Sequence, residues 1–276
     1  MRRPLAARDP LTTLNAGPAE PVSVPPFTVS ACIEMLFAEG SYPERARRAA
    51  DAGAGAVEIW GHDDVDLDAL TDACADAGVE LVSMVGSGAP LVDPDGHDAA
   101  VADIRDSIAV AEAHDVPTLI VTVGQARDDL DRETQRDAVV DALAAVAPDA
   151  EDAGVTLVVE PLNTAVDHAG YFLAESGPAF DILREVDSPR VQLLYDVYHQ
   201  QVTEGNIIET LTDNLDLVGH VHIADVPGRH EPGTGELNYE NVLGALAEAG
   251  YDAAVGCEYR PTVDDADALG ATLDRL

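Results

Sequence analysis

The sequence contains no lysine: all 15 basic residues are arginine, against 52 aspartate and glutamate residues and a net charge of −37. Nucleic-acid binding requires a basic stripe, so we expect no nucleic-acid partner. At about 1 M salt the Debye length falls to about 3 Å, which screens repulsion within an acidic surface. The composition therefore predicts a protein adapted to molar salt, from a halophile. An acidic surface that binds a partner is the alternative.

Cysteine and long apolar runs are also scarce. Cys32, Cys74 and Cys257 are odd in number and widely spaced, which excludes a disulfide framework and a CxxC zinc pattern. We expect these side chains to be small and buried. No run approaches the roughly 18 consecutive apolar residues of a membrane span. We therefore predict a cytoplasmic protein with no membrane partner. Residues 1–26, rich in proline and alanine, are predicted to be a disordered extension that precedes one domain, 27–276.

Short β-branched runs alternate with longer amphipathic stretches from residue 27 onward. The β-like runs cover 27–33, 56–60, 79–86, 118–124, 155–160, 191–196, 217–223 and 253–258. The helical patterns cover 42–53, 67–77, 98–114, 133–153, 177–186, 205–214, 239–249 and 263–275. This strict alternation predicts the α/β class and a single (β/α)8 TIM barrel. A doubly wound open sheet, the alternative, would show a glycine-rich phosphate turn, and GSG at 86–88 is too short for one.

Four consecutive β-like runs end in side chains that can bind metals. Active sites of (β/α)8 barrels lie at the carboxyl ends of the strands, so the last residue of each run is informative. From the fifth run to the eighth these residues are Glu160, Asp196, His222 and Glu258. Three converging carboxylates would repel one another unless a cation or protons neutralised them. We therefore predict that the four residues share a divalent ion of the Mn²⁺, Mg²⁺ or Co²⁺ kind.

Each of these residues also has an ordinary structural explanation. A carboxylate at a strand end often caps the following helix, and a histidine in an apolar strand often belongs to the core. Four such residues on adjacent strands favour the metal site.

Two further residues are candidates for substrate binding. His199 lies three positions after Asp196 and could hydrogen-bond an oxygen of a bound ligand. Arg229 follows the seventh run, where its guanidinium could hold a substrate carboxylate or hydroxyl. A surface ion pair is the alternative for Arg229.

Four other residues lie in or near these runs. Trp60 and His62 follow the second run and are expected to form a wall of the pocket. His220 is expected to face the helices, and His230 is expected to be an ordinary loop residue.

Four segments resemble the hydroxypyruvate isomerase family, within the xylose-isomerase-like barrel superfamily: VEPLN, YDVYHQQVTEGN, GHVHIADVPGRHEPGTGELNY and GYDAAVGCEYRP. The resemblance is strongest over residues 155–261 and weaker over 27–154. It implies that Glu160 and Glu258 flank the substrate as proton donor and acceptor, and that Asp196 and the residue at position 222 complete a metal site. The reaction that it implies interconverts hydroxypyruvate and tartronate semialdehyde through an enediolate.

The sequence departs from the family pattern at positions that bear on the substrate. Typical members carry glutamine where this chain has His222, whereas related ketose 3-epimerases carry histidine there and a histidine placed like His199. After CEYRP the chain continues TVDD, where the family commonly has an Arg-Gly pair. A ketose 3-epimerase, or another sugar or inosose isomerase or dehydratase, is therefore the main alternative.

Two more distant functions are further alternatives. An endonuclease-like hydrolase would need further ligands, such as His62 and His97, and a basic groove. A non-catalytic sugar-binding barrel would leave the four strand-end ligands without a purpose. We expect a small keto acid or sugar as the substrate, and a homo-oligomer is one alternative for the assembly.

Overall fold

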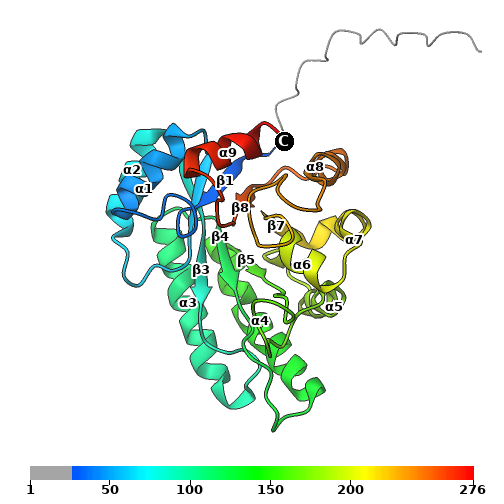
Figure 1. Ribbon diagram of the computed structural model, residues 1–276. Coiled ribbons are helices and arrows are strands. Elements are labelled where there is room, and N and C mark those ends of the chain that lie inside the picture. The colour runs from blue at the N-terminus through cyan, green and yellow to red at the C-terminus, as the bar shows by residue number, and fades with distance from the viewer. Residues whose placement is uncertain (1–26) are drawn as a thin grey trace, which may run out of the picture.

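The computed structural model describes residues 27–276, and the predicted N-terminal extension lies outside these residues. Within them, parallel strands pair in chain order from β1 to β8, and β8 pairs with β1 to close a barrel (Figure 1). The strands are β1 Val29–Cys32, β2 Ala56–Ile59, β3 Glu80–Ser87, β4 Thr118–Val121, β5 Thr156–Val159, β6 Val191–Asp196, β7 Val218–Ile223 and β8 Val255–Cys257. The predicted (β/α)8 TIM barrel is therefore confirmed.

Helices follow the strands and cover the outside of the barrel (Figure 1). They are α1 Tyr42–Asp51, α2 Leu67–Ala77, α3 His97–Ala113, α4 Arg132–Ala153, α5 Ser176–Val186, α6 Val197–Thr203, α7 Ile207–Asp213, α8 Tyr239–Glu248 and α9 Asp265–Leu273. Short 3₁₀ turns lie at Pro94–Gly96 and Leu215–Leu217. Helices α2 and α4 end at Gly78 and Gly154, which adopt the left-handed conformation that suits glycine at this position.

The prediction of one helix over 205–214 was incomplete. The chain turns directly from β6 into α6, and Gly205 and Asn206, both with positive φ, separate α6 from α7. The missed helix, α6, carries His199. Asp196 caps the first turn of α6, and the side chain of His199 is buried.

The apolar side chains of strands and helices form one large buried cluster between the two layers. A second small cluster consists of Ile120, Val158 and Leu194. On β5 and β6, Val158 and Leu194 lie two residues before the strand-end residues Glu160 and Asp196. Side chains two apart on a strand point to the same side, so this cluster lies beneath Glu160 and Asp196 inside the barrel. All three cysteines are free and buried, as predicted. None of the helices in residues 27–276 is long and apolar enough to cross a membrane.

Candidate active site

The strand-end side chains converge at one rim of the barrel. Each of Glu160, Asp196, His222 and Glu258 offers an oxygen or nitrogen atom, and these atoms lie within 4.8 Å of one another. Asp196 and His222 are register partners on β6 and β7, whereas Glu160 and Glu258 directly follow β5 and β8. All four residues are buried. We refer to these four residues as the carboxylate cluster.

Asp196 both caps a helix and faces the carboxylate cluster. Its Oδ1 accepts hydrogen bonds from the backbone N–H groups of Tyr198 and His199, at 2.7 and 3.2 Å. Its Oδ2 has no hydrogen-bond partner among the described residues. The ordinary N-cap explanation is therefore correct for one oxygen, and the other oxygen is available to a ligand.

The two glutamates of the cluster are in different electrostatic environments. Burial, followed by the negative charge of Glu258, raises the pKa of Glu160. Burial acts in the same direction on Glu258, but the positive charge of His222, whose Nδ1 lies 3.3 Å from Glu258 Oε2, outweighs it and lowers the pKa of Glu258. One carboxyl group therefore favours the protonated form and the other the ionised form, a division that suits an acid and a base.

Two side chains donate hydrogen bonds to Glu258 at this rim of the barrel. The indole Nε1 of Trp60 donates to Glu258 Oε1 at 2.8 Å. The guanidinium of Arg229 donates to Glu258 Oε2 and lies 3.6 Å from Asp196 Oδ2. Arg229 is only 11% exposed, so the surface ion pair considered as its alternative is wrong. Its Nε has no hydrogen-bond partner among residues 27–276, which leaves a buried donor for a ligand.

His199 has a defined tautomer. The backbone N–H of Asn163 donates to His199 Nδ1 at 3.1 Å, and because this N–H cannot accept a hydrogen bond, Nδ1 carries no proton. The proton therefore lies on Nε2, which has no partner within the described chain and is 3.6 Å from Asp196 Oδ2. Burial lowers the pKa of His199. His199 is thus a neutral donor directed toward the carboxylate cluster.

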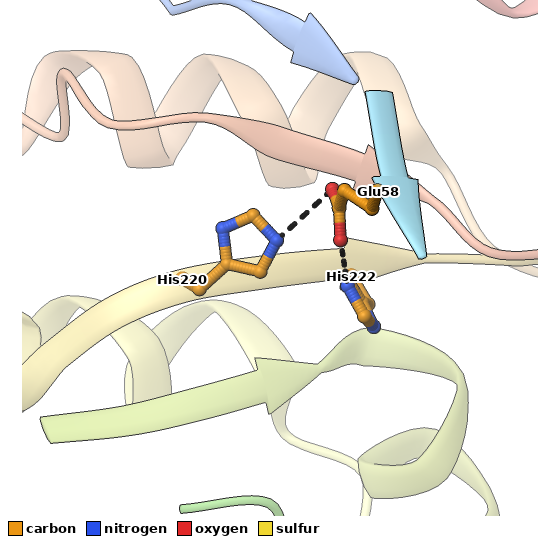
Figure 2. Close-up of side chains that lie close together, drawn as sticks. All are labelled: Glu58, His220 and His222. Carbon is orange, nitrogen blue, oxygen red and sulfur yellow. Dashed lines mark hydrogen bonds and ion pairs between the residues drawn. The ribbon is translucent and has the colours of Figure 1, made fainter. Parts of the chain in front are cut away.

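The position of His220 differs from the prediction. Figure 2 shows His220 and His222 on β7, both directed at Glu58 on β2. His220 Nε2 lies 3.1 Å from Glu58 Oε1, so His220 points into the barrel rather than toward the helices. The reason is geometric: His220 and His222 are two residues apart on one strand and share a face. Glu58 itself was not predicted, although a carboxylate inside the apolar run AVEIW was a signal.

The remaining predicted residues lie in different places. Trp60 contacts Glu258, as described, and is 48% exposed; its role as a wall of a pocket stays a prediction. His62 instead lies 3.0 Å from the hydroxyl of Ser107. His230 Nδ1 lies 2.7 Å from the carbonyl oxygen of Arg260, a contact between two loops.

The chemistry of the carboxylate cluster fits a divalent cation. Glu160 Oε1, Asp196 Oδ2 and His222 Nδ1 are all buried without a hydrogen-bond partner among the described residues. Leaving buried polar atoms without partners costs about 1–3 kcal/mol each. An ion with oxygen and imidazole ligands would satisfy these atoms and reduce the repulsion among the carboxylates.

The fold and the site together define the class of protein. A model of the xylose isomerase-like TIM barrel family matches residues 46–276. The chain belongs to this family.

Similar proteins of known name agree with this assignment. A putative hydroxypyruvate isomerase of Homo sapiens is 32% identical, over 88% of this chain and 93% of that protein. A 2-oxo-tetronate isomerase of Cupriavidus necator is 32% identical, over 87% and 95%. A crystal structure of an AP endonuclease, family 2, from Brucella melitensis superimposes with a TM-score of 0.83 at 30% identity, over 89% and 98%. The names of the two isomerases confirm the predicted family resemblance and the prediction of an isomerase.

Proposed function

We propose that this protein is a divalent-metal-dependent isomerase that moves a proton between neighbouring carbons of a small 2-oxo acid, with hydroxypyruvate as the first candidate substrate. The main support is the carboxylate cluster. It joins two glutamates to an aspartate and a histidine, and three of these residues carry a buried atom that has no hydrogen-bond partner among the described residues. Glu160, Asp196, His222 and Glu258 would hold the ion.

The chain's own residues would carry out the proton transfers. When bound, a divalent ion would polarise the substrate's carbonyl and hydroxyl oxygens and stabilise their negative charge. Glu258, which Trp60 and Arg229 hold in place, would remove a proton from the hydroxymethyl carbon, C3. Glu160, the other glutamate of the cluster, would deliver a proton to C2. The hydroxyl proton passes from the oxygen on C3 to the oxygen on C2, so that the product is an isomer and no electrons are exchanged. Positioned groups of this kind contribute about 10²–10⁴-fold each.

Two side chains would orient such a substrate. The Nε2–H of His199 would donate to a substrate oxygen as negative charge develops there. The buried Nε of Arg229 would donate to the substrate carboxylate. An acid substrate also agrees with the relatives, since hydroxypyruvate and 2-oxo-tetronate both carry a carboxylate.

A ketose 3-epimerase is the second candidate. His222 and His199, the two residues that resemble the epimerase pattern, both lie at the cluster. An epimerase would use the same pair of glutamates but return the proton to the opposite face of the same carbon.

A substrate panel tests these proposals. The protein, treated with a chelator and then reloaded with Mn²⁺ or Mg²⁺ in molar KCl, would be assayed with hydroxypyruvate, 2-oxo-tetronate and neutral ketoses. We expect turnover of the acids only after reloading. Turnover of ketoses alone would favour the epimerase. Full activity in a sample shown by elemental analysis to be metal-free would remove the ion from the mechanism.

A further inference from the structure

A second group of buried polar side chains lies beside the carboxylate cluster and shares His222 with it. Glu58 accepts a hydrogen bond from the hydroxyl of Ser30 on β1. Its two oxygens face two different histidines of β7: Oε1 is 3.1 Å from His220 Nε2, and Oε2 is 2.9 Å from His222 Nε2 (Figure 2). Glu58, His220 and His222 are each about 2% exposed. We call Ser30, Glu58, His220 and His222 the inner network, so that His222 belongs to both groups.

The inner network differs from the carboxylate cluster in how well its atoms are satisfied. Both oxygens of Glu58 have hydrogen-bond partners, whereas three atoms of the cluster, including His222 Nδ1, have none among residues 27–276. The three residues Glu58, His220 and His222 lie close enough to hold an ion. Their hydrogen bonds already satisfy Glu58 without one, so the inner network fits a supporting role better than a second metal site.

The hydrogen bond from His222 to Glu58 determines what His222 offers to the cluster. An ionised carboxylate can only accept hydrogen bonds, so the ring nitrogen that faces Glu58 must carry a hydrogen. When a cation takes the place of the proton on Nδ1, the ring is neutral, keeps its hydrogen on Nε2 and directs its lone pair from Nδ1. Nδ1 is the atom on the side of Glu258, 3.3 Å from its Oε2.

We propose that Glu58 is a positioning residue for His222. By accepting the Nε2–H, it fixes the tautomer and the ring plane that present the Nδ1 lone pair to the cation of the proposed function, on which this inference rests. Ser30 and His220 hold the Glu58 carboxylate in place. A carboxylate behind a metal-binding histidine also raises the basicity of the ligand nitrogen, and losing one typically costs about 10–100-fold in metal affinity.

The backbone of β8 leaves room for this arrangement only at a glycine. Gly256 is the register partner of both His222 and Ser30. A Cβ at this position would lie 2.6 Å from Cδ2 of His222 and closer still to Oε1 of Glu58. The hydrogen-bonded pair is therefore packed against bare backbone, which restricts the rotation of both side chains.

A double-mutant cycle that measures Mn²⁺ affinity tests the proposal without an activity assay. The dissociation constant for Mn²⁺ would be measured by calorimetry in molar KCl for the full-length wild type, Glu58→Gln, His222→Ala and the double variant. We expect Glu58→Gln to weaken binding about 10–100-fold in the wild-type background. We expect no further loss when His222 is already alanine, because Glu58 then has no ligand to position.

The control variant is Glu231→Gln, which also replaces a buried, hydrogen-bonded glutamate but one that contacts Thr262 instead of the cluster. Its Mn²⁺ affinity should stay within about twofold of the wild type. Wild-type affinity in Glu58→Gln, or an equal loss in the His222→Ala background, would overturn the proposal. The protein could bind Mn²⁺ as this cycle predicts and yet isomerise none of the candidate substrates. That result would support the positioning role of Glu58 and contradict only the proposed function.

A measurement on the wild type covers the case in which Glu58→Gln does not fold. In protein loaded with diamagnetic Mg²⁺, long-range proton–nitrogen NMR spectra report which imidazole nitrogen carries hydrogen. The His222 signals are assigned by their loss in His222→Gln. We expect a protonated Nε2 and an unprotonated Nδ1. The reverse tautomer would refute the proposal.

Discussion

Replacing Arg229 with alanine should separate acid substrates from neutral ones. Arg229 has a buried Nε without a partner among the described residues, and it reaches Glu258 and Asp196. A substrate carboxylate would gain at least one charge-assisted hydrogen bond there, and such bonds contribute about 1.5–3 kcal/mol. At 1.4 kcal/mol per tenfold change, the loss corresponds to about 10–150-fold in kcat/KM for hydroxypyruvate.

The substitution has a second effect that the assay must separate from the first. Arg229 also helps to lower the pKa of Glu258, so Arg229→Ala should raise that pKa and change the rate of proton removal from acid and neutral substrates alike. Dihydroxyacetone differs from hydroxypyruvate only in having a hydroxymethyl group in place of the carboxylate. Its affinity as a competitive ligand therefore measures how far the site itself has changed.

We expect Arg229→Ala to weaken the binding of hydroxypyruvate much more than that of dihydroxyacetone. Arg229→Lys, which keeps the charge but loses the planar fork, should lie between the wild type and the alanine variant. Equal losses for the two ligands would refute the reasoning and would mean that Arg229 shapes the loop after β7 rather than binding a carboxylate.

Three other predictions follow from the site and the composition. Glu160→Gln and Glu258→Gln should each lower kcat by about 10²-fold or more in variants that retain metal; wild-type rates in both would refute the proton-transfer roles. Trp60, the single tryptophan, donates to Glu258, so saturable quenching of its fluorescence by Mn²⁺ but not by Mg²⁺ is expected; calorimetric binding without quenching would place the ion elsewhere. With a net charge of −37, the thermal midpoint should rise between about 0.1 and 3 M KCl, and a constant midpoint would count against a salt-adapted surface.

Much of the candidate site could be predicted from the sequence because (β/α)8 barrels place the ends of their strands at one rim. The four strand-end residues needed only the order of the β-like runs, and the structure brings them within 4.8 Å. The common face of His220 and His222 was also available from their spacing of two, although the prediction assigned it wrongly. The roles of the four strand-end residues in catalysis and metal binding stay predictions.

Other features depend on contacts between distant parts of the chain. Glu58 meets His222 because the barrel closes, which brings β2 and β7 to opposite sides of one narrow interior across 164 positions of sequence. Trp60 reaches Glu258 across 198 positions.

The tautomer of His199 likewise follows from a backbone N–H 36 residues earlier in the chain.

Local sequence patterns specify which residues form strands and which side of a strand they face, since these depend on neighbours along the chain. Which atoms then lie within about 3 Å of one another depends on strand tilt, register and loop conformation. These are set by the packing of the whole barrel, so no local pattern in the sequence could supply the hydrogen bonds that orient His199, His222 and Glu258.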